Sequence, residues 1–185
     1  MNEQTRLSPA RDWIVAFTAL DFERMMRLGA FDDMRVELVS GDLEKMMPAL
    51  PAHGERNFAV GMRLFQALGS EFRIGTDIAI RIDAITVRAA DIAVYPASLA
   101  GDRLPDGSEI LLAVEIADTM LSRDLGAKVT DYARAGVQNY WVVDATARVV
   151  HVMRERRADG FAVREIVRFG EPLILIEQRG PITID

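Results

Sequence analysis

Two apolar segments, each interrupted by a single carboxylate, constrain the fold of this chain more than any other feature. Residues 89–95 (AADIAVY) contain Asp91, and residues 110–117 (ILLAVEIA) contain Glu115. Both segments are short and bounded by turn residues, which is typical of strands covered on both faces. An ionised carboxylate buried in such a strand costs several kcal/mol unless a positive group compensates it. A metal ion shared by the two acids, with Lys128 nearby, would be such a partner.

The remaining segments predict a mixed α/β (α+β) fold in which helices flank a mixed sheet. Helices are expected after Thr18, along the apolar stripe that runs from Phe58 to Phe72, and from Ser122 to Gly136. Strands are expected at 35–39, 43–47, 78–82, 89–95, 110–117, 139–144, 149–153, 163–169 and 173–176. We expect one domain over residues 1–185, with residues 1–12 as a loose N-terminal arm.

Charge and composition limit the classes of partner and metal. The net charge is −6 and the pI about 5.0, so bulk electrostatics repels nucleic acid and any DNA binding requires a local basic patch or a metal ion. With no cysteine and only two histidines, the available ligands favour a hard cation such as Mg²⁺ over structural zinc. No apolar run approaches the ~20 residues of a membrane span, which predicts a soluble cytoplasmic protein.

Each residue of this candidate site also has an ordinary structural interpretation. Asp91 and Glu115 can be strand-end acids that reach solvent or pair with an arginine such as Arg88. Lys128 lies four residues after Asp124, a spacing that supplies a common surface ion pair on a helix.

Other polar residues leave alternatives open in the same way. Glu37 stands on an alternating strand, where an exposed side chain is the common case. His53 either caps the entrance of its helix or approaches the site. Tyr132 is expected in the core, with a hydroxyl that can hydrogen-bond the site. His151 is expected to face outward, and Asp144 to stabilise a turn.

Several segments in order along the chain resemble the Uma-two family of restriction endonucleases. These segments are 35–46, His53 at the start of a helix, 90–96, 114–116 and 124–144. The last, which includes YARAGVQNYWVVD, is the most specific, whereas the short acidic motifs alone are weak.

The resemblance implies the PD-(D/E)XK nuclease fold and its chemistry. Asp91 and Glu115, on neighbouring strands, would then bind Mg²⁺ or Mn²⁺, with the backbone carbonyl of Ile116 as a further ligand. Glu37 would join the catalytic set. Lys128, on the following helix, would replace the lysine that the standard motif carries two residues after the acid.

The sequence departs from the family pattern at three places. The standard lysine position is occupied by Ala117, and Ala90 replaces the usual proline before the metal-binding aspartate. Residues 117–121 stand where relatives carry a serine- and proline-rich turn, and Asp118 adds a negative charge close to the site.

Three functions follow from these observations. The first is a metal-dependent endonuclease that hydrolyses phosphodiester bonds of nucleic acid, DNA more than RNA, as a homodimer. The second is a catalytically inactive protein of the same fold that acts as an interaction or assembly module, which the acidic balance favours. The third is a metal-dependent hydrolase with a substrate other than nucleic acid.

Overall fold

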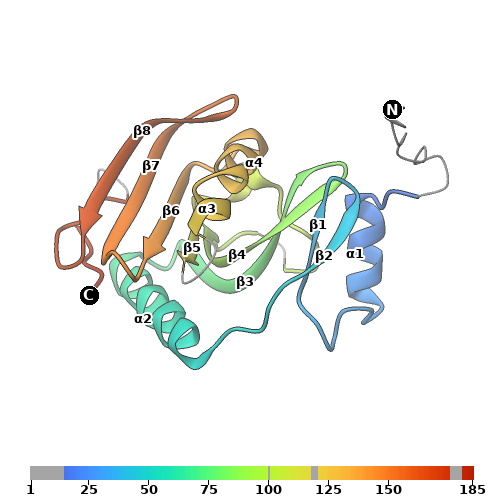
Figure 1. The fold of residues 1–185 in the computed structure, drawn as a ribbon, viewed down its shortest axis with the longest axis horizontal. Helices are drawn as coiled ribbons and strands as arrows, with labels where there is room; N and C mark the ends of the chain where they lie inside the picture. Colours follow the sequence, from blue (N-terminus) through green and yellow to red (C-terminus); the bar gives the residue numbers. More distant parts are fainter. Residues whose placement is uncertain (1–14, 100, 118–120, 176–180) are drawn as a thin grey trace, which may run out of the picture.

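An eight-stranded mixed sheet forms the centre of the protein, with helices on both of its faces (Figure 1). The structure, a computed structural model, describes residues 15–99, 101–117, 121–175 and 181–185; the predicted arm at 1–12 lies outside them. The helices are α1 (Ala19–Arg27), α2 (Pro51–Ala67), α3 (Leu121–Asp124), α4 (Ala127–Ala135) and the 3₁₀ turn η1 (Gly107–Glu109). The strands are β1 (Val36–Val39), β2 (Asp42–Lys45), β3 (Phe72–Asp83), β4 (Thr86–Pro96), β5 (Leu112–Ala117), β6 (Asn139–Asp144), β7 (Val149–Arg157) and β8 (Gly160–Arg168).

The sheet has the strand order β2-β1-β4-β5-β6-β7-β8, and β3 pairs with β4 in addition. Strands β5 and β6 are parallel, and the other named strand pairs are antiparallel. The chain between the parallel strands carries α3 and α4, because a parallel connection needs a crossover of this kind. The predicted mixed sheet flanked by helices is confirmed.

Strand β4 has three partners, and this creates a fork in the sheet. Strand β3 pairs along the whole of β4, so β1 and β5 must share the other edge. On that edge β1 pairs at Leu38 with Val87, and the pairing with β5 begins at Ile92 with Val114. Residues 88–91 lie between these two pairings, where β1 and β5 diverge.

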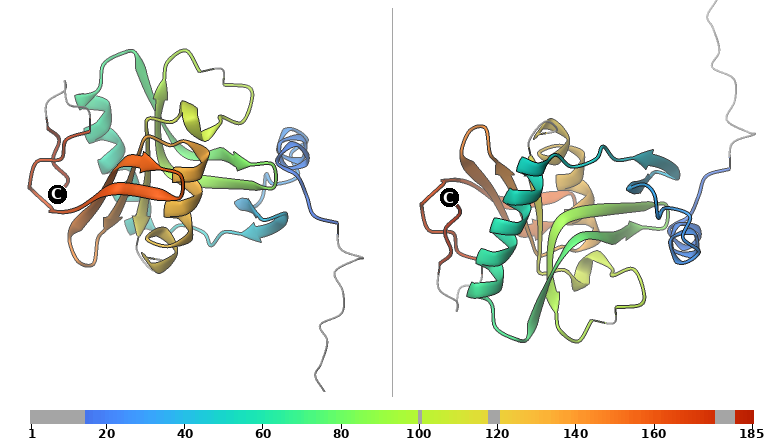
Figure 2. Two further views of the ribbon diagram at one scale, coloured as in Figure 1. Left: turned by 90° about the horizontal axis from the view of Figure 1, so that it is seen from above. Right: turned by 90° about the horizontal axis from the view of Figure 1, so that it is seen from below.

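The two faces of the sheet are packed differently. Figure 2 shows α4 in front of the sheet in one view and α2 in front of it in the opposite view. The α2 face is filled by large aliphatic side chains of β4 to β6 and Trp141: Ile92, Val94, Leu112, Val114, Ile116 and Val143. The α4 face has alanines from the same strands, packed against tyrosines: Ala90, Ala93, Ala113, Ala117, Tyr132 and Tyr140.

Helix ends agree with the sequence at two positions. Thr18 caps α1, where its hydroxyl accepts a hydrogen bond from the Asp21 amide at 3.1 Å. Gly136 ends α4 in the left-handed conformation, with φ of 101°, which a glycine adopts without strain.

Other predicted boundaries are wrong. The helix expected from Ser122 begins at Leu121 and is broken into α3 and α4 around Gly126. Pro51 is the first residue of α2, a position that suits its fixed φ. Phe72 begins β3 instead of extending the helix. Near the C-terminus Leu173 forms only an isolated bridge with Ile182, and residue 176 lies outside the described residues.

Candidate active site

Four of the residues singled out by sequence meet at the fork between β1 and β5. Glu37 comes from β1, Asp91 from β4, Glu115 from β5 and Lys128 from α4. The exposed fractions of their side chains are 0%, 9%, 4% and 5% in that order. The site is therefore a buried cluster of charges, and the surface interpretations of Glu37 and Lys128 do not apply.

Asp91 takes the place of a backbone acceptor at the end of the β4–β5 ladder. Its Oδ2 accepts a hydrogen bond of 2.7 Å from the Ile116 amide. Its Oδ1 lies 3.3 Å from Nε2 of His53, and Nδ2 of Asn57 donates to the Asp91 carbonyl at 3.1 Å. His53 thus lies beside the site, while the residue at the capping position of α2 is Leu50.

Lys128 lies among three carboxylates. Its Nζ is 2.8 Å from Oε2 of Glu115, 3.6 Å from Oδ1 of Asp124 and 3.8 Å from Oε1 of Glu37. The other oxygen of Glu115 accepts a hydrogen bond of 2.8 Å from the Tyr132 hydroxyl. Both oxygens of Glu115 therefore have partners, and the pair of Lys128 with Asp124 is buried instead of lying on the surface.

Glu37 binds the arginines around the fork. Its Oε1 accepts a hydrogen bond from the Ala89 amide at 3.0 Å, and its Oε2 accepts from Arg88 at 3.1 Å and also from Arg123. Arg88 binds Asp131 as well, at 2.7 Å. Of the alternative in which an arginine such as Arg88 pairs with these acids, Arg88 itself does not take part, because Glu37 and Asp131 are its partners. Another arginine does, since Arg35 lies 4.0 Å from Oδ1 of Asp91.

The electrostatics of the cluster follow from burial and from unbalanced negative charge. Burial raises the pKa of Glu115 to about 8; Lys128 opposes this shift, and the negative charges of Asp91 and Asp124 add to it. Burial also raises the pKa of Asp124. For Lys128 burial favours the neutral amine, but the charges of Glu115, Glu37 and Asp124 outweigh it and raise its pKa. Lys128 is therefore a cation at neutral pH, and a further positive ion beside Glu115 would oppose the effect of burial on the pKa of that carboxyl.

The oxygen atoms at the fork suit a hard divalent cation that takes only a few of its ligands from the protein. Among the described residues, no group of three or more Asp, Glu or His side chains is arranged to hold a metal ion. Mg²⁺, however, commonly binds through one or two carboxylates and completes its shell with water and substrate phosphate. Asp91 and Glu115 supply two, and the buried Oδ1 of Asn57 has no hydrogen-bond partner within the described part of the chain. Asn57 is thus a further oxygen donor on a side chain that contacts the backbone of Asp91.

Sequence reasoning missed two residues at the fork, Asn57 and Arg123. Asn57 lies one turn after His53 on α2, so the helical period could have indicated it. No local signal indicated Arg123, which reaches Glu37 across 86 positions of sequence. Asp118 lies outside the described residues.

Two of the remaining expectations are borne out. Tyr132 is buried in the core, and its hydroxyl donates to Glu115. Asp144 stabilises a turn, where its Oδ1 accepts a hydrogen bond of 2.8 Å from the Ala147 amide. His151 is partly buried on β7.

In the described residues, no helix has the length and apolar character needed to cross a membrane.

Comparisons with known proteins agree with this architecture. The sequence profile of the Uma2 family, described as "Putative restriction endonuclease", matches residues 20–179. A crystal structure of "a putative nuclease belonging to DUF820" from Anabaena variabilis is similar in fold, with a TM-score of 0.57 and 14% sequence identity. The similarity covers 74% of this chain and 77% of the other. None of the curated proteins compared matches the chain.

Proposed function

The chain belongs to the Uma2 family of restriction-endonuclease-like proteins, and on this premise we propose that it is a metal-dependent nuclease whose substrate is DNA. The observation that carries the proposal is the pairing of acids at the fork. The antiparallel pairing of β4 with β5 ends at Ile92 and Val114, and Asp91 and Glu115 are the next residues on the two strands. Glu115 is also bound to Lys128 at 2.8 Å.

In this proposal Asp91 and Glu115 would hold Mg²⁺ or Mn²⁺, with the Ile116 carbonyl and Asn57 Oδ1 as further oxygen donors. The bound ion would polarise the scissile phosphate and lower the pKa of a water molecule. Lys128 keeps its charge when buried, so it can stabilise the negative charge that develops on the phosphoryl oxygens.

The remaining residues hold these groups in place. Tyr132 donates to Glu115 and fixes the orientation of its carboxylate. Glu37 has the Ala89 amide, Arg88 and Arg123 as partners, and it lies 3.8 Å from Lys128. Its role in the proposal is therefore to position Lys128.

The test is cleavage of supercoiled and linear DNA, and of RNA, with Mg²⁺, with Mn²⁺ and with a chelator. We expect ion-dependent cleavage that falls by about 10²-fold or more in Asp91→Asn and in Lys128→Met. The matched control is Asp83→Asn, which removes an acid that pairs with Arg134 away from the fork. Cleavage that persists in both site variants would identify a contaminating nuclease.

Calorimetric titration with Mg²⁺ separates binding from turnover. Asp91→Ala and Glu115→Ala should each weaken or abolish the binding heat, and unchanged binding in both would contradict the metal site. Metal binding without cleavage of any nucleic acid would favour a hydrolase with another substrate. Absence of both would favour a non-catalytic module.

We extend the proposal to a homodimer that associates through α2. Phe58 and Phe65 on this helix are 70% and 67% exposed, although they are large and apolar. Gly54 and Gly61 lie at the same helical spacing, and the space beside each is open. In an antiparallel pair of α2 helices, each phenylalanine would meet a glycine of a second copy. Sedimentation of Phe58→Glu against the unchanged protein tests this, and a monomer in both cases would contradict it.

A further inference from the structure

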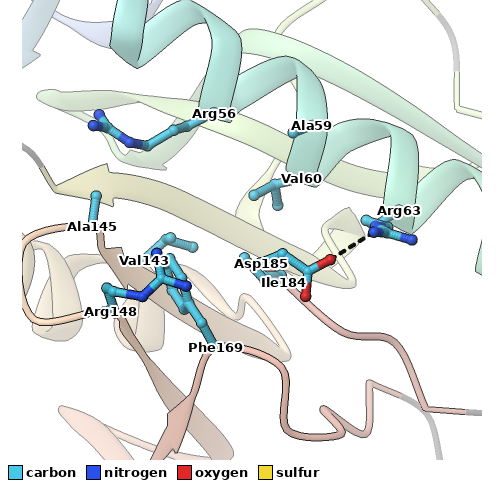
Figure 3. Close-up of a pocket in the computed structure, with 10 residues that line it drawn as sticks. All are labelled: Arg56, Ala59, Val60, Arg63, Val143, Ala145, Arg148, Phe169, Ile184 and Asp185. Atoms are coloured by element: carbon cyan, nitrogen blue, oxygen red, sulfur yellow. Dashed lines mark hydrogen bonds and ion pairs between the residues drawn. The ribbon is translucent and has the colours of Figure 1, made fainter.

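A cavity of about 240 Å³ lies between α2 and the end of β6. Its floor is apolar and includes Val143 and Phe169, and three arginines lie around it: Arg56, Arg63 and Arg148. Figure 3 shows Arg56 and Arg63 extending from the helix, and Arg148 crossing the ring of Phe169 on the other side of the cavity.

The lining carries more positive than negative charge. Asp185 is its single acid, and Arg63 binds that acid at 2.7 Å. The guanidinium carbon of Arg148 lies 5.2 Å from the centre of the Phe169 ring, and within the described residues no ion pair to Arg148 is found. On a chain whose net charge is −6, this lining is a local concentration of positive charge.

The cavity is adjacent to the fork along α2. His53 approaches Asp91 at 3.3 Å, and Arg56 and Arg63 follow on the same helix, roughly 5 Å and 15 Å further along the axis at about 1.5 Å per residue. Phosphates of one DNA strand are spaced by about 3.4 Å along the duplex axis, so the arginines lie within roughly four nucleotides of the fork.

We propose that this cavity binds a backbone phosphate of the nucleic acid strand, a few nucleotides from the bond that is cut. The inference rests on the proposed nuclease function. The planar guanidinium groups of arginines fit phosphate oxygens. The stacked pair of Arg148 and Phe169 offers a surface for the adjoining nucleotide. The cavity is smaller than the roughly 300 to 1,000 Å³ of sites for whole small molecules, which fits a group within a longer chain.

The test measures strand binding without turnover. A fluorescently labelled single strand of about 16 nucleotides is titrated with the full chain in a chelator, and its anisotropy gives the affinity. The variants are Arg148→Asn, which suits the left-handed backbone of this residue (φ of 54°), and Arg63→Gln. Arg24→Gln is the control, since Arg24 is 68% exposed on α1, and Figure 1 shows this helix well away from β6, β7 and β8.

We expect each cavity variant to bind the strand about 10-fold more weakly than the control, the size of one charged hydrogen bond. The slope of the logarithm of affinity against the logarithm of salt concentration should fall by about 0.7 for each lost phosphate contact. Equal affinities and slopes in the cavity variants and the control would overturn the inference, and so would a failure of the unchanged protein to bind the strand.

Parallel cleavage assays with Mg²⁺ separate this result from the proposed function. If the protein cleaves DNA and the cavity variants bind as the control does, the inference fails and the nuclease proposal stands. If the cavity variants lose binding and no preparation cleaves, the cavity holds a strand in a protein that is not a nuclease.

Discussion

The two faces of β4 and β5 differ in what they bury, although the same strands supply both. The face toward α2 carries Ile92 and Val114, which are fully buried among other large aliphatic side chains. The face toward α4 carries Ala93 and Ala113, and the acids of the fork adjoin them. Small residues leave space on one face for tyrosines and a buried charge cluster. The α2 face is thus packed with large apolar side chains, whereas the α4 face carries the charge cluster, and four predictions test this division.

The largest effect is expected from removal of the cation on the α4 face. Lys128→Met should lower the free energy of unfolding by about 3–5 kcal/mol, because Glu115 and Asp124 would stay buried without a positive partner. Urea unfolding measures the loss. The double variant Lys128→Met/Glu115→Gln is the control and should recover part of it, whereas a loss below about 1 kcal/mol would mean that the cluster is open to water.

The next effect is expected from added volume on the same face. Ala113→Val should destabilise the protein by about 1–3 kcal/mol, since the added methyl groups enter a packed layer that includes Tyr132 of α4 and Tyr140 of β6. Thermal and urea unfolding measure this change. A neutral or stabilising result would show that the α4 face holds spare space.

The pH dependence of stability should show the charge cluster directly. The pKa of Glu115 is about 8 in the folded protein against an ordinary value of 4.5, so between these limits the folded state holds a proton that the unfolded state has released. Stability therefore falls as pH rises through this window, by at most about 1.4 kcal/mol per pH unit. Urea unfolding at a series of pH values measures the slope.

Two comparisons check that this slope belongs to Glu115. The variant Glu115→Gln should remove it, and saturating Mg²⁺ should flatten it, because metal binding displaces the proton. A slope that is the same in the variant and in the unchanged protein would assign the titration to another group.

The smallest effect is expected on the apolar face. Ile92→Val should cost about 0.5–1.5 kcal/mol, and metal-dependent cleavage per folded molecule should stay unchanged, because Ile92 points away from the fork. Parallel urea and cleavage measurements check both parts. A large loss of cleavage with little loss of stability would contradict the separation of the two faces.

The sequence predicted the fold and the acids of the fork for a physical reason. A lone carboxylate in an apolar run is costly unless compensated, so Asp91 and Glu115 stood out without any alignment. Lys128 was indicated only by family resemblance, since a helix lysine beside Asp124 has an ordinary surface interpretation. Arg123 reaches Glu37 across 86 positions, and no local pattern encodes such a contact.

The fork has a consequence for how this protein can change over generations. Strand β1 is in register with β4 at a single pair, Leu38 with Val87, and Glu37 ties the same strand to β4 and α3 through its arginine partners and the Ala89 amide. The ion pairs around the fork therefore also hold the β1–β2 hairpin against the rest of the molecule. A relative without catalytic activity would still be under selection to keep many of these ion pairs, because they hold the hairpin in place. The presence of these residues in a sequence is therefore not by itself a sign of activity.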